Sequence, residues 1–464
     1  MNDRQLYAFL LVLVAFAAGL CIAFSQAINY VVIPNNGQIS SDITAKSGSA
    51  KDIQTAVNQA AASSNGMGNV RIPAGTFNFI NVGDPWMTVD VPAGVNVFGA
   101  PTQRYANGSV ISWNTILILP VDIGGDIDTS WQYTWFSFSG SGNPTKPSRI
   151  SDVKLVGYRS AHPLSITMTV GISISNVMDF RIDHCCLEDI CGDGITIDGL
   201  NCRGVIDHCS LYNLYGWDDL GGYSDSNVGY GIYPSRYLTA PFDATMNVLG
   251  KYTNYTIFIE NCYFSWWRHC VASGHGAHYV FRYNIIDHDL GHFSLDVRGL
   301  RDTQTNRAGG RAAEFYENTF TNVNQYIPQQ VLNGNLTGVS YKSTPSSSPD
   351  YRAVLQDGGG CGVFFNNYID RSYDSDGIAL YTEDDVASAT WHLQDLYSWS
   401  TKGPWPTNGV NGVWPDFSAD RHVEAYWTRQ AGISTDANYP NVDPSWSIAG
   451  YKPYSYPHPL TLGT

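Results

Sequence analysis

The stretch Ile182-Asp-His-Cys-Cys-Leu187 is the first of six related stretches in the chain. Each begins and ends with an apolar residue and carries Cys or Asn at its fourth position. Such self-similarity is the sequence signature of a repeat architecture. The later copies are Ile206-Asp-His-Cys-Ser-Leu211, Ile259-Glu-Asn-Cys-Tyr-Phe264, Phe281-Arg-Tyr-Asn-Ile-Ile286, Phe315-Tyr-Glu-Asn-Thr-Phe320 and Phe364-Phe-Asn-Asn-Tyr-Ile369.

The spacing of the repeat indicates stacked coils. The shortest intervals between fourth positions are 24 and 22 residues, and the longer ones predict extra coils or insertions. At about 3.3 Å per residue, one such interval has room for three short strands and three bends. Successive coils then pair strand on strand, in parallel, about 4.8 Å apart. We therefore predict an all-β, single-stranded, right-handed parallel β-helix.

The fourth positions are expected to form an internal ladder at one bend. An Asn amide can bond along the stack while its backbone tolerates turn conformations. Cys is small and readily buried, so it can replace Asn there as a reduced thiol. We leave open one disulfide elsewhere, such as Cys191 with Cys202. The ladder residues are Cys185, Cys209, Cys262, Asn284, Asn318 and Asn367.

Helical periodicity over Asp52–Ala62 predicts one amphipathic helix ahead of the strands. A terminal unit must cover the open apolar end of a coil stack, so this helix is expected to cap it. We assign residues 28–50 to a lead-in and 51–372 to the β-helix, with inserted loops at 212–252 and 324–352. Residues 373–464, rich in Trp, Pro and Gly, are expected to form an irregular aromatic tail that packs on the coils.

The chain begins like an exported protein. Leu6–Phe24 is an unbroken run of apolar and small residues, followed by Ser25-Gln-Ala27. Residues 1–27 are therefore either a signal peptide cleaved after Ala27 or an uncleaved membrane anchor. Both alternatives place the body outside the cytosol, extracellular or at the cell surface. Three sequons predict glycosylation, at Asn107, Asn254 and Asn335.

Charge limits the partners. The formal net charge is −15, so nucleic acid and anionic membrane surfaces are poor partners. An acidic polysaccharide would also be repelled overall, unless a local basic groove or bridging cations reversed the field. A neutral glycan meets no such barrier.

The chain resembles the pectate-lyase-like parallel β-helix superfamily over about residues 50 to 372. The resemblance rests on the helix, then "NVRIPAGTFNF", then "VNVFGA", then coils of "IDHC" type. It implies the fold but no single activity, because that superfamily includes polysaccharide lyases, glycoside hydrolases, epimerases, phage tailspikes and non-catalytic surface proteins. The "RIDH" at Arg181–His184 is similar to a lyase strand motif. Asp183 recurs in the repeat as Asp207, however, so we give it no catalytic role.

The densest polar constellation runs from His269 to Glu314. Cleavage by β-elimination needs a base and a cation that neutralises a uronate carboxylate, whereas hydrolysis needs two carboxylates. The alternative is a solvated or ion-paired loop. We predict catalytic groups among Asp287, His288, Asp289, His292, Arg298 and Arg301. We predict substrate contacts from Trp217, His275, His278 and Arg311, and weak calcium candidates in Asp218 and Asp219.

Two classes of function remain open. The first is an extracellular polysaccharide-cleaving enzyme, with a lyase ahead of a glycoside hydrolase and no cofactor beyond a candidate Ca²⁺. The second is a non-catalytic surface protein that binds glycans, adheres, or self-assembles into filaments through its open coil ends.

Overall fold

The chain forms two compact units. The structure is a computed structural model. It describes residues 41–63, 65–80, 88–119, 133–157, 169–190, 192–213, 229–236, 248–267, 269–287, 293–297, 310–321, 353–357, 360–370, 378–382, 393–399 and 451–462. One unit spans residues 40–454. The other contains the short helix α4 (Pro459–Leu462). None of the helices in these described ranges is long and apolar enough to cross a membrane, and the apolar run at 6–24 lies outside them.

Three parallel sheets make up the larger unit. Sheet A contains, in spatial order, β1 (Ser41–Thr44), β2 (Gly68–Arg71), β5 (Val95–Phe98), β10 (Arg149–Ser151), β13 (Met178–Asp183), β16 (Arg203–Asp207), β19 (Thr256–Glu260), β22 (His278–Arg282), β25 (Ala312–Tyr316), β28 (Gly360–Phe365) and β31 (Leu393–Trp399).

Sheet B contains β3 (Gly75–Asn78), β8 (Thr115–Ile118), β11 (Val153–Val156), β14 (Cys186–Glu188), β17 (Ser210–Tyr212), β20 (Tyr263–Ser265), β23 (Ile285–Asp287), β26 (Thr319–Thr321) and β29 (Tyr368–Asp370). Sheet C contains β4 (Val89–Pro92), β9 (Tyr133–Ser139), β12 (Thr169–Ser175), β15 (Gly192–Asp198), β18 (Tyr230–Pro234), β21 (His269–Ser273), β24 (Phe293–Val297), β27 (Ala353–Asp357) and β30 (Ile378–Thr382). A separate antiparallel hairpin joins β6 (Gln103–Arg104) to β7 (Val110–Ser112).

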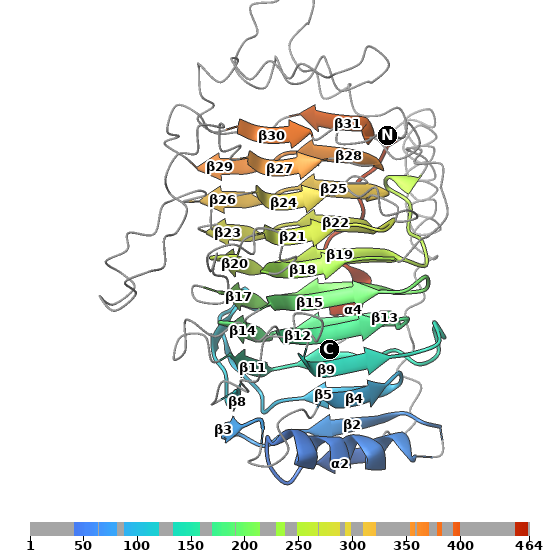
Figure 1. Cartoon of the computed structure of the whole chain (residues 1–464), viewed down its shortest axis with the longest axis vertical. Helices are drawn as coiled ribbons and strands as arrows, with labels where there is room; N and C mark the ends of the chain where they lie inside the picture. The colour runs from blue at the N-terminus through green and yellow to red at the C-terminus, as the bar shows by residue number, and fades with distance from the viewer. Residues whose placement is uncertain are drawn as a thin grey trace, which may run out of the picture. The chain divides into compact units, whose positions relative to one another are not determined.

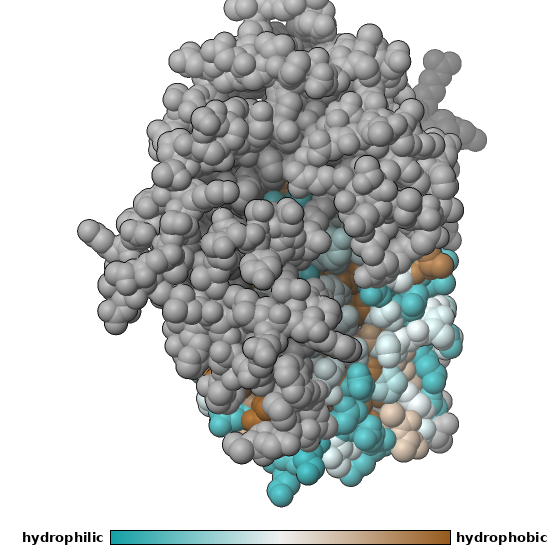
Figure 2. Space-filling model, in the orientation of Figure 1, coloured by the Kyte–Doolittle hydropathy of each residue, from teal (hydrophilic) through white to brown (hydrophobic). Residues whose placement is uncertain are grey.

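The chain visits sheets A, B and C in turn, and Figure 1 shows the strands stacked coil upon coil. The predicted right-handed parallel β-helix is confirmed. The apolar first position of the repeat fills the interior, because it is in register from coil to coil and fully buried. This stack is Ile182, Ile206, Ile259, Phe281, Phe315 and Phe364. In the space-filling view, the coloured residues on the visible face are mostly hydrophilic or neutral (Figure 2).

The ladder lies at the short bend between sheets A and B. The backbone N–H of Asn284 donates to Asn318 Oδ1 at 3.0 Å, and that of Asn318 donates to Asn367 Oδ1 at 3.0 Å. The N–H of Cys262 donates to Asn284 Oδ1 at 2.9 Å. The thiols of Cys185, Cys209 and Cys262 instead donate to carbonyls of the preceding coil. The residue before each ladder position has positive φ, for example 52° at His184.

The cysteines of the ladder are free thiols, as expected. Cys202 is also a free thiol, so the suggested disulfide between Cys191 and Cys202 was wrong. Cys202 is buried in the hydrophobic core, and burial raises the pKa of its thiol to about 12. A thiol of that kind behaves as a small apolar side chain.

A helix covers the first coils. Helix α2 (Ala50–Ala61) begins after Ser49, whose side chain accepts a hydrogen bond from the Asp52 N–H at 3.3 Å. Its buried face, which includes Ile53 and Val57, belongs to the same hydrophobic core as the strands. Figure 1 shows α2 at the end of the stack nearest β2. Helix α2 thus has the position of the expected cap.

The coils extend beyond the limits that the repeat indicates. β30 and β31 continue sheets C and A past residue 372, the expected end. β18 lies inside the stretch 212–252, which is therefore not one continuous loop. All three strands pair by backbone hydrogen bonds and need no copy of the repeat. The expected loop at 324–352 and residues 400–450 of the tail lie outside the described residues.

Connection lengths differ around the coil. Most bends from sheet A to sheet B are short, as between Asp183 and Cys186, whereas residues 99–114, which include the β6–β7 hairpin, join β5 to β8. The connections entering and leaving sheet C include residues 213–229, 298–311 and 322–352. Sheet C is therefore the sheet flanked on both sides by long insertions, which commonly carry binding and catalytic groups.

Candidate functional site

The outer face of sheet C carries an aligned row of polar and aromatic side chains. Asp193, Tyr230 and His269 lie on the neighbouring strands β15, β18 and β21, outside the hydrophobic interior that their neighbours Ile195 and Ile232 fill. Tyr230 is in register with His269, and their ring centroids are 5.4 Å apart. The Tyr230 N–H donates to Asp193 Oδ1 at 3.2 Å. Strand pairing thus fixes the order of the row.

His269 is also close to a carboxylate on the next strand. Its Nε2 lies 3.7 Å from Oδ2 of Asp296, and both side chains are almost fully buried. At that distance the two groups attract strongly when the imidazole is protonated. An imidazole held between a phenol and a carboxylate can accept a proton from a substrate that is bound on this face of sheet C. We call His269, Asp296 and Tyr230 the sheet C triad.

The carboxylates of this face are widely separated. Asp193 lies on β15 and Asp296 on β24, which are three strand steps apart, or about 14 Å. Asp198 lies five residues beyond Asp193 on the same strand, or roughly 16 Å along it. A glycosidase needs its two carboxyl groups about 5 to 9.5 Å apart. Among the described residues of β15 to β24, no carboxylate pair across these strands meets that requirement.

The predicted constellation from His269 to Glu314 is divided among three sheets. Asp287 ends β23 of sheet B, where its Oδ2 accepts from the Tyr263 hydroxyl at 2.8 Å and its Oδ1 from Thr321 at 3.2 Å. Burial, together with Asp287, raises the pKa of Tyr263 to about 12. Asp287 therefore does not share a face with His269. Residues adjacent in sequence enter successive sheets that face different directions.

His278 belongs to sheet A and is fully buried. Its Nδ1 lies 3.3 Å from Thr256 Oγ1, and its Nε2 lies 3.4 Å from Glu314 Oε1. Glu314 also accepts from the Gly250 N–H and the Tyr451 hydroxyl, each at 2.8 Å. His278 thus lies within a buried hydrogen-bond network of sheet A, and its role in substrate contact stays a prediction.

Two other predicted residues gather at the far edge of sheet C. His275 Nδ1 lies 2.9 Å from Ser235 Oγ, just beyond β18 and β21. Arg311 precedes β25, and its Cζ is 5.7 Å from the ring centroid of Tyr255. These two residues retain positions from which a substrate on sheet C could be contacted.

The remaining predictions fall largely on residues that the structure does not describe. These are Trp217, Asp218, Asp219, His288, Asp289, His292, Arg298, Arg301 and Asn335, and they stay predictions. In the described ranges, no group of His, Cys, Asp or Glu side chains could hold a metal ion. Asn107 and Asn254 are exposed, and Asn254 Oδ1 accepts from Arg203 at 3.2 Å.

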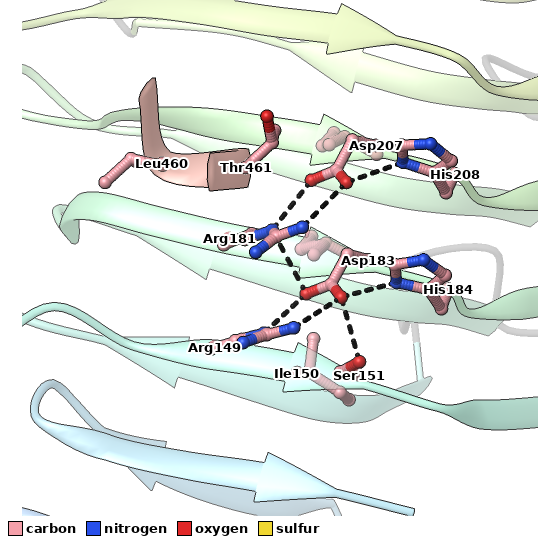
Figure 3. Close-up of polar contacts among 12 residues, drawn as sticks. Arg149, Ile150, Ser151, Arg181, Asp183, His184, Asp207, His208, Leu460 and Thr461 are labelled. Carbon is pink, nitrogen blue, oxygen red and sulfur yellow. Dashed lines mark hydrogen bonds and ion pairs between the residues drawn. The ribbon is translucent and has the colours of Figure 1, made fainter. Parts of the chain in front are cut away.

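The "RIDH" stretch forms a buried ion-pair network on sheet A (Figure 3). Arg149 donates to both oxygens of Asp183, at 2.6 and 2.7 Å, and the Ser151 hydroxyl donates to Asp183 Oδ2 at 3.0 Å. Burial alone would raise the pKa of Asp183. The contacts with His184, Arg149 and Arg181 outweigh it and hold that pKa well below its usual range.

The next coil repeats the arrangement. Arg181 donates to both oxygens of Asp207, at 2.9 and 3.0 Å, and His208 Nδ1 lies 2.9 Å from Asp207 Oδ2. The rings of His184 and His208 stack at 5.0 Å and 7°. Both carboxylates are fully buried and satisfied within the protein. The network is therefore structural, in line with the decision to give Asp183 no catalytic role.

The sequence analysis places His269 at the start of the polar constellation but assigns no role to His269 or Tyr230. The strand "FSLDV" contains part of the signal, since Asp296 lies there between the buried Leu295 and Val297. What the sequence could not supply was the strand register that brings residues 269 and 296 together.

No protein-family model matches the chain, and no curated protein matches its sequence. Among solved structures, an alginate lyase from Paenibacillus is 11% identical, with a TM-score of 0.35 over 78% of this chain and 99% of that one. The A-module of a mannuronan C-5 epimerase from Azotobacter vinelandii is 15% identical, with a TM-score of 0.40 over 81% and 88%. A surface adhesin of Streptococcus pneumoniae is 13% identical, with a TM-score of 0.37 over 79% and 91%. Likeness this distant carries no argument about activity.

Proposed function

We propose that the protein is a polysaccharide lyase whose reaction takes place on the outer face of sheet C. The observation that supports this most is the sheet C triad, with Nε2 of His269 3.7 Å from Oδ2 of Asp296 and the Tyr230 ring 5.4 Å from the imidazole. Long connections enter and leave sheet C, and connections of this length commonly carry binding and catalytic groups.

The chemistry assigns one role to each group. Neutral His269 removes the C5 proton beside the carboxylate of a uronic acid. The C4–O bond then breaks, a C4–C5 double bond forms, and the leaving oxygen takes a proton. Asp296 stabilises the imidazolium that the first step creates. Tyr230 can donate its own hydroxyl proton to the leaving oxygen, because its phenol is an O–H donor on the adjacent strand, and the proton held by His269 then restores the phenol.

Hydrolysis is the less favoured alternative for this face. It requires two carboxylates on opposite sides of the scissile bond, and Asp193 and Asp296 are about 14 Å apart by strand count. Elimination needs no second carboxylate: His269 provides the single base, and the cation that neutralises the uronate carboxylate is a separate requirement.

We also propose that the protein acts outside the cytosol, as a secreted or surface-bound protein. The apolar run Leu6–Phe24 followed by Ser25-Gln-Ala27 supports export. Mass spectrometry of the mature protein tests this, because cleavage after Ala27 gives a new N-terminus at Ile28. An intact N-terminus in a cytosolic fraction would contradict export.

The reaction type is tested by product analysis. The full-length protein is incubated with a panel of acidic and neutral polysaccharides, and unsaturated ends and new reducing ends are both measured. A lyase produces one unsaturated end for every new reducing end. Reducing ends without unsaturated ends would show hydrolysis, and no product from any glycan would favour the non-catalytic alternative.

A further inference from the structure

A cationic cluster lies at the edge of sheet C that is remote from His269. The Cζ of Arg236 is 3.5 Å from the ring centroid of Tyr255, and that of Arg311 is 5.7 Å from the same centroid. Both distances are within cation–π range. The two Cζ atoms are therefore at most about 9 Å apart. We call Arg236, Arg311 and Tyr255 the arginine cluster.

The positions of both arginines are fixed by the coils. Ser235 follows β18, and its N–H donates to the Ile197 carbonyl at 2.7 Å. Arg236 is the next residue. The N–H of Arg311 donates to the Ala277 carbonyl at 2.9 Å. Two like charges are thus held on one aromatic ring by backbone pairing, so the arrangement exists before any ligand arrives.

Arg236 has no carboxylate partner among the described residues. Its Nε is buried and has no hydrogen-bond partner in those ranges. Burial lowers the pKa of Arg236, and the nearby positive charge of Arg311 lowers it further. By contrast, Arg149, Arg181, Arg203 and Arg282 each contact an Asp or Glu. A half-buried guanidinium beside a second cation gains most from an anion that enters from outside.

We propose that the arginine cluster binds a negatively charged group, a carboxylate or a sulfate ester, on a sugar of the bound polysaccharide. Arg is suited to such groups because its planar guanidinium can donate two parallel hydrogen bonds to them. The cluster resolves a difficulty raised by the net charge of −15, since it supplies the local positive field that an acidic polymer needs.

The cluster is separate from the reacting sugar. Ser235 pairs with Gly274, which lies five residues along the strand direction from His269, or roughly 16 Å. The polymer must therefore carry negative charge on a sugar other than the one that loses its proton. This inference rests on the proposed function in that it takes the ligand to be a polysaccharide.

Direct binding tests the inference. Calorimetric titration of the full-length protein uses three oligosaccharides of equal length: a uronic-acid oligomer, a sulfated oligomer and a neutral glucan. At least one acidic oligomer should bind at least tenfold more tightly than the glucan, and the preference should shrink as salt rises. The comparison of the two acidic oligomers identifies the anionic group.

Variants locate the binding to the cluster. Arg236→Gln should remove the preference for acidic oligomers, and Arg311→Gln should reduce it. Arg71→Gln is the matched control, because Arg71 lies 4.4 Å over the Phe98 ring but has Asp42 within 3.8 Å. It should bind like the parent. Thermal melting establishes that each variant is folded, and Arg236→Lys provides a second variant that keeps the charge while losing the paired donors.

Two results would overturn the inference: a parent protein with no preference for either acidic oligomer, or a folded Arg236→Gln protein that keeps the preference. His269→Ala separates this outcome from the proposed function. That variant should lose turnover and retain acidic binding. A parent that cleaves no glycan but prefers acidic oligomers through Arg236 would contradict the lyase and support the cluster.

Discussion

The Asp183 carboxylate and the Arg149 guanidinium form a two-point ion pair between neighbouring coils, with N–O distances of 2.6 and 2.7 Å. The pair lies on the outer face of sheet A, yet Asp183 is fully buried. A buried charge is tolerated only when it is paired and hydrogen-bonded, and here Ser151 and His184 complete the shell.

Asp183→Asn should lower the free energy of unfolding by about 3–5 kcal/mol, because it leaves the guanidinium of Arg149 without its partner. Urea unfolding of the purified protein measures this. Asp42→Asn is the control, since Asp42 and Arg71 form an exposed pair at 3.8 Å that contributes at most about 1 kcal/mol. Equal losses in the two variants would contradict the structural importance of the network.

The same carboxylate predicts a pH dependence. The pKa of Asp183 is lowered in the folded protein, so the unfolded chain binds its proton first as the pH falls. Its stabilising contribution is fully present above the unfolded value of about 3.9 and is lost below it. The stability gap between the parent and Asp183→Asn should be constant from pH 7 to 5 and narrow below about pH 4. A stability gap that stays constant down to pH 3 would contradict a lowered pKa of Asp183 in the folded protein.

The ladder predicts a second large loss. Asn318 Oδ1 accepts the Asn284 N–H at 3.0 Å, and its Nδ2 donates to the Phe281 carbonyl at 2.9 Å. Asn318→Ala leaves the buried Asn284 N–H and the buried Phe281 carbonyl without partners. Each unpaired group should lower the free energy of unfolding by about 1–3 kcal/mol. Asn58→Ala, on the exposed side of α2, should change stability by less than about 0.5 kcal/mol. Chemical denaturation of both variants makes the comparison.

The buried thiols should be inert in the native state. Burial raises the pKa of Cys186 to about 12 and raises that of Cys185 and Cys209 well above the usual value. Because the thiolate is the reactive form, a maleimide reagent should label these residues only after unfolding. Peptide mapping after timed labelling tests this. Fast labelling of Cys185 in native protein would show that the ladder opens.

The fold could be predicted from the sequence because the repeat is local. Each copy holds its own ladder residue and its own apolar positions, so the coil, the bend and the cap follow from nearby residues. Strand β18 was missed because its "YGIYP" pairs through the backbone and lacks the repeat. A strand needs only exposed N–H and C=O groups to join a sheet, and no side-chain pattern marks that.

The candidate site was harder to predict because residues that are close in sequence lie on different sheets, whereas residues that are close in space lie about one coil apart in the chain. Asp287 and His278 are close to His269 in sequence, yet they lie on sheets B and A. Asp296 is far from His269 in sequence and lies on the adjacent strand of sheet C. Register depends on the lengths of the intervening connections, which vary from coil to coil.

The most direct test of the lyase proposal is the kcat/KM for unsaturated-end formation in two histidine variants. His269→Ala and His208→Ala each remove an imidazole that lies beside an aspartate, at 3.7 and 2.9 Å respectively. Loss of a general base typically costs about 10²–10⁴-fold in rate. We predict such a loss for His269→Ala, with His208→Ala within a few-fold of the parent. Equal activity in the two folded variants would contradict the assignment of catalysis to sheet C.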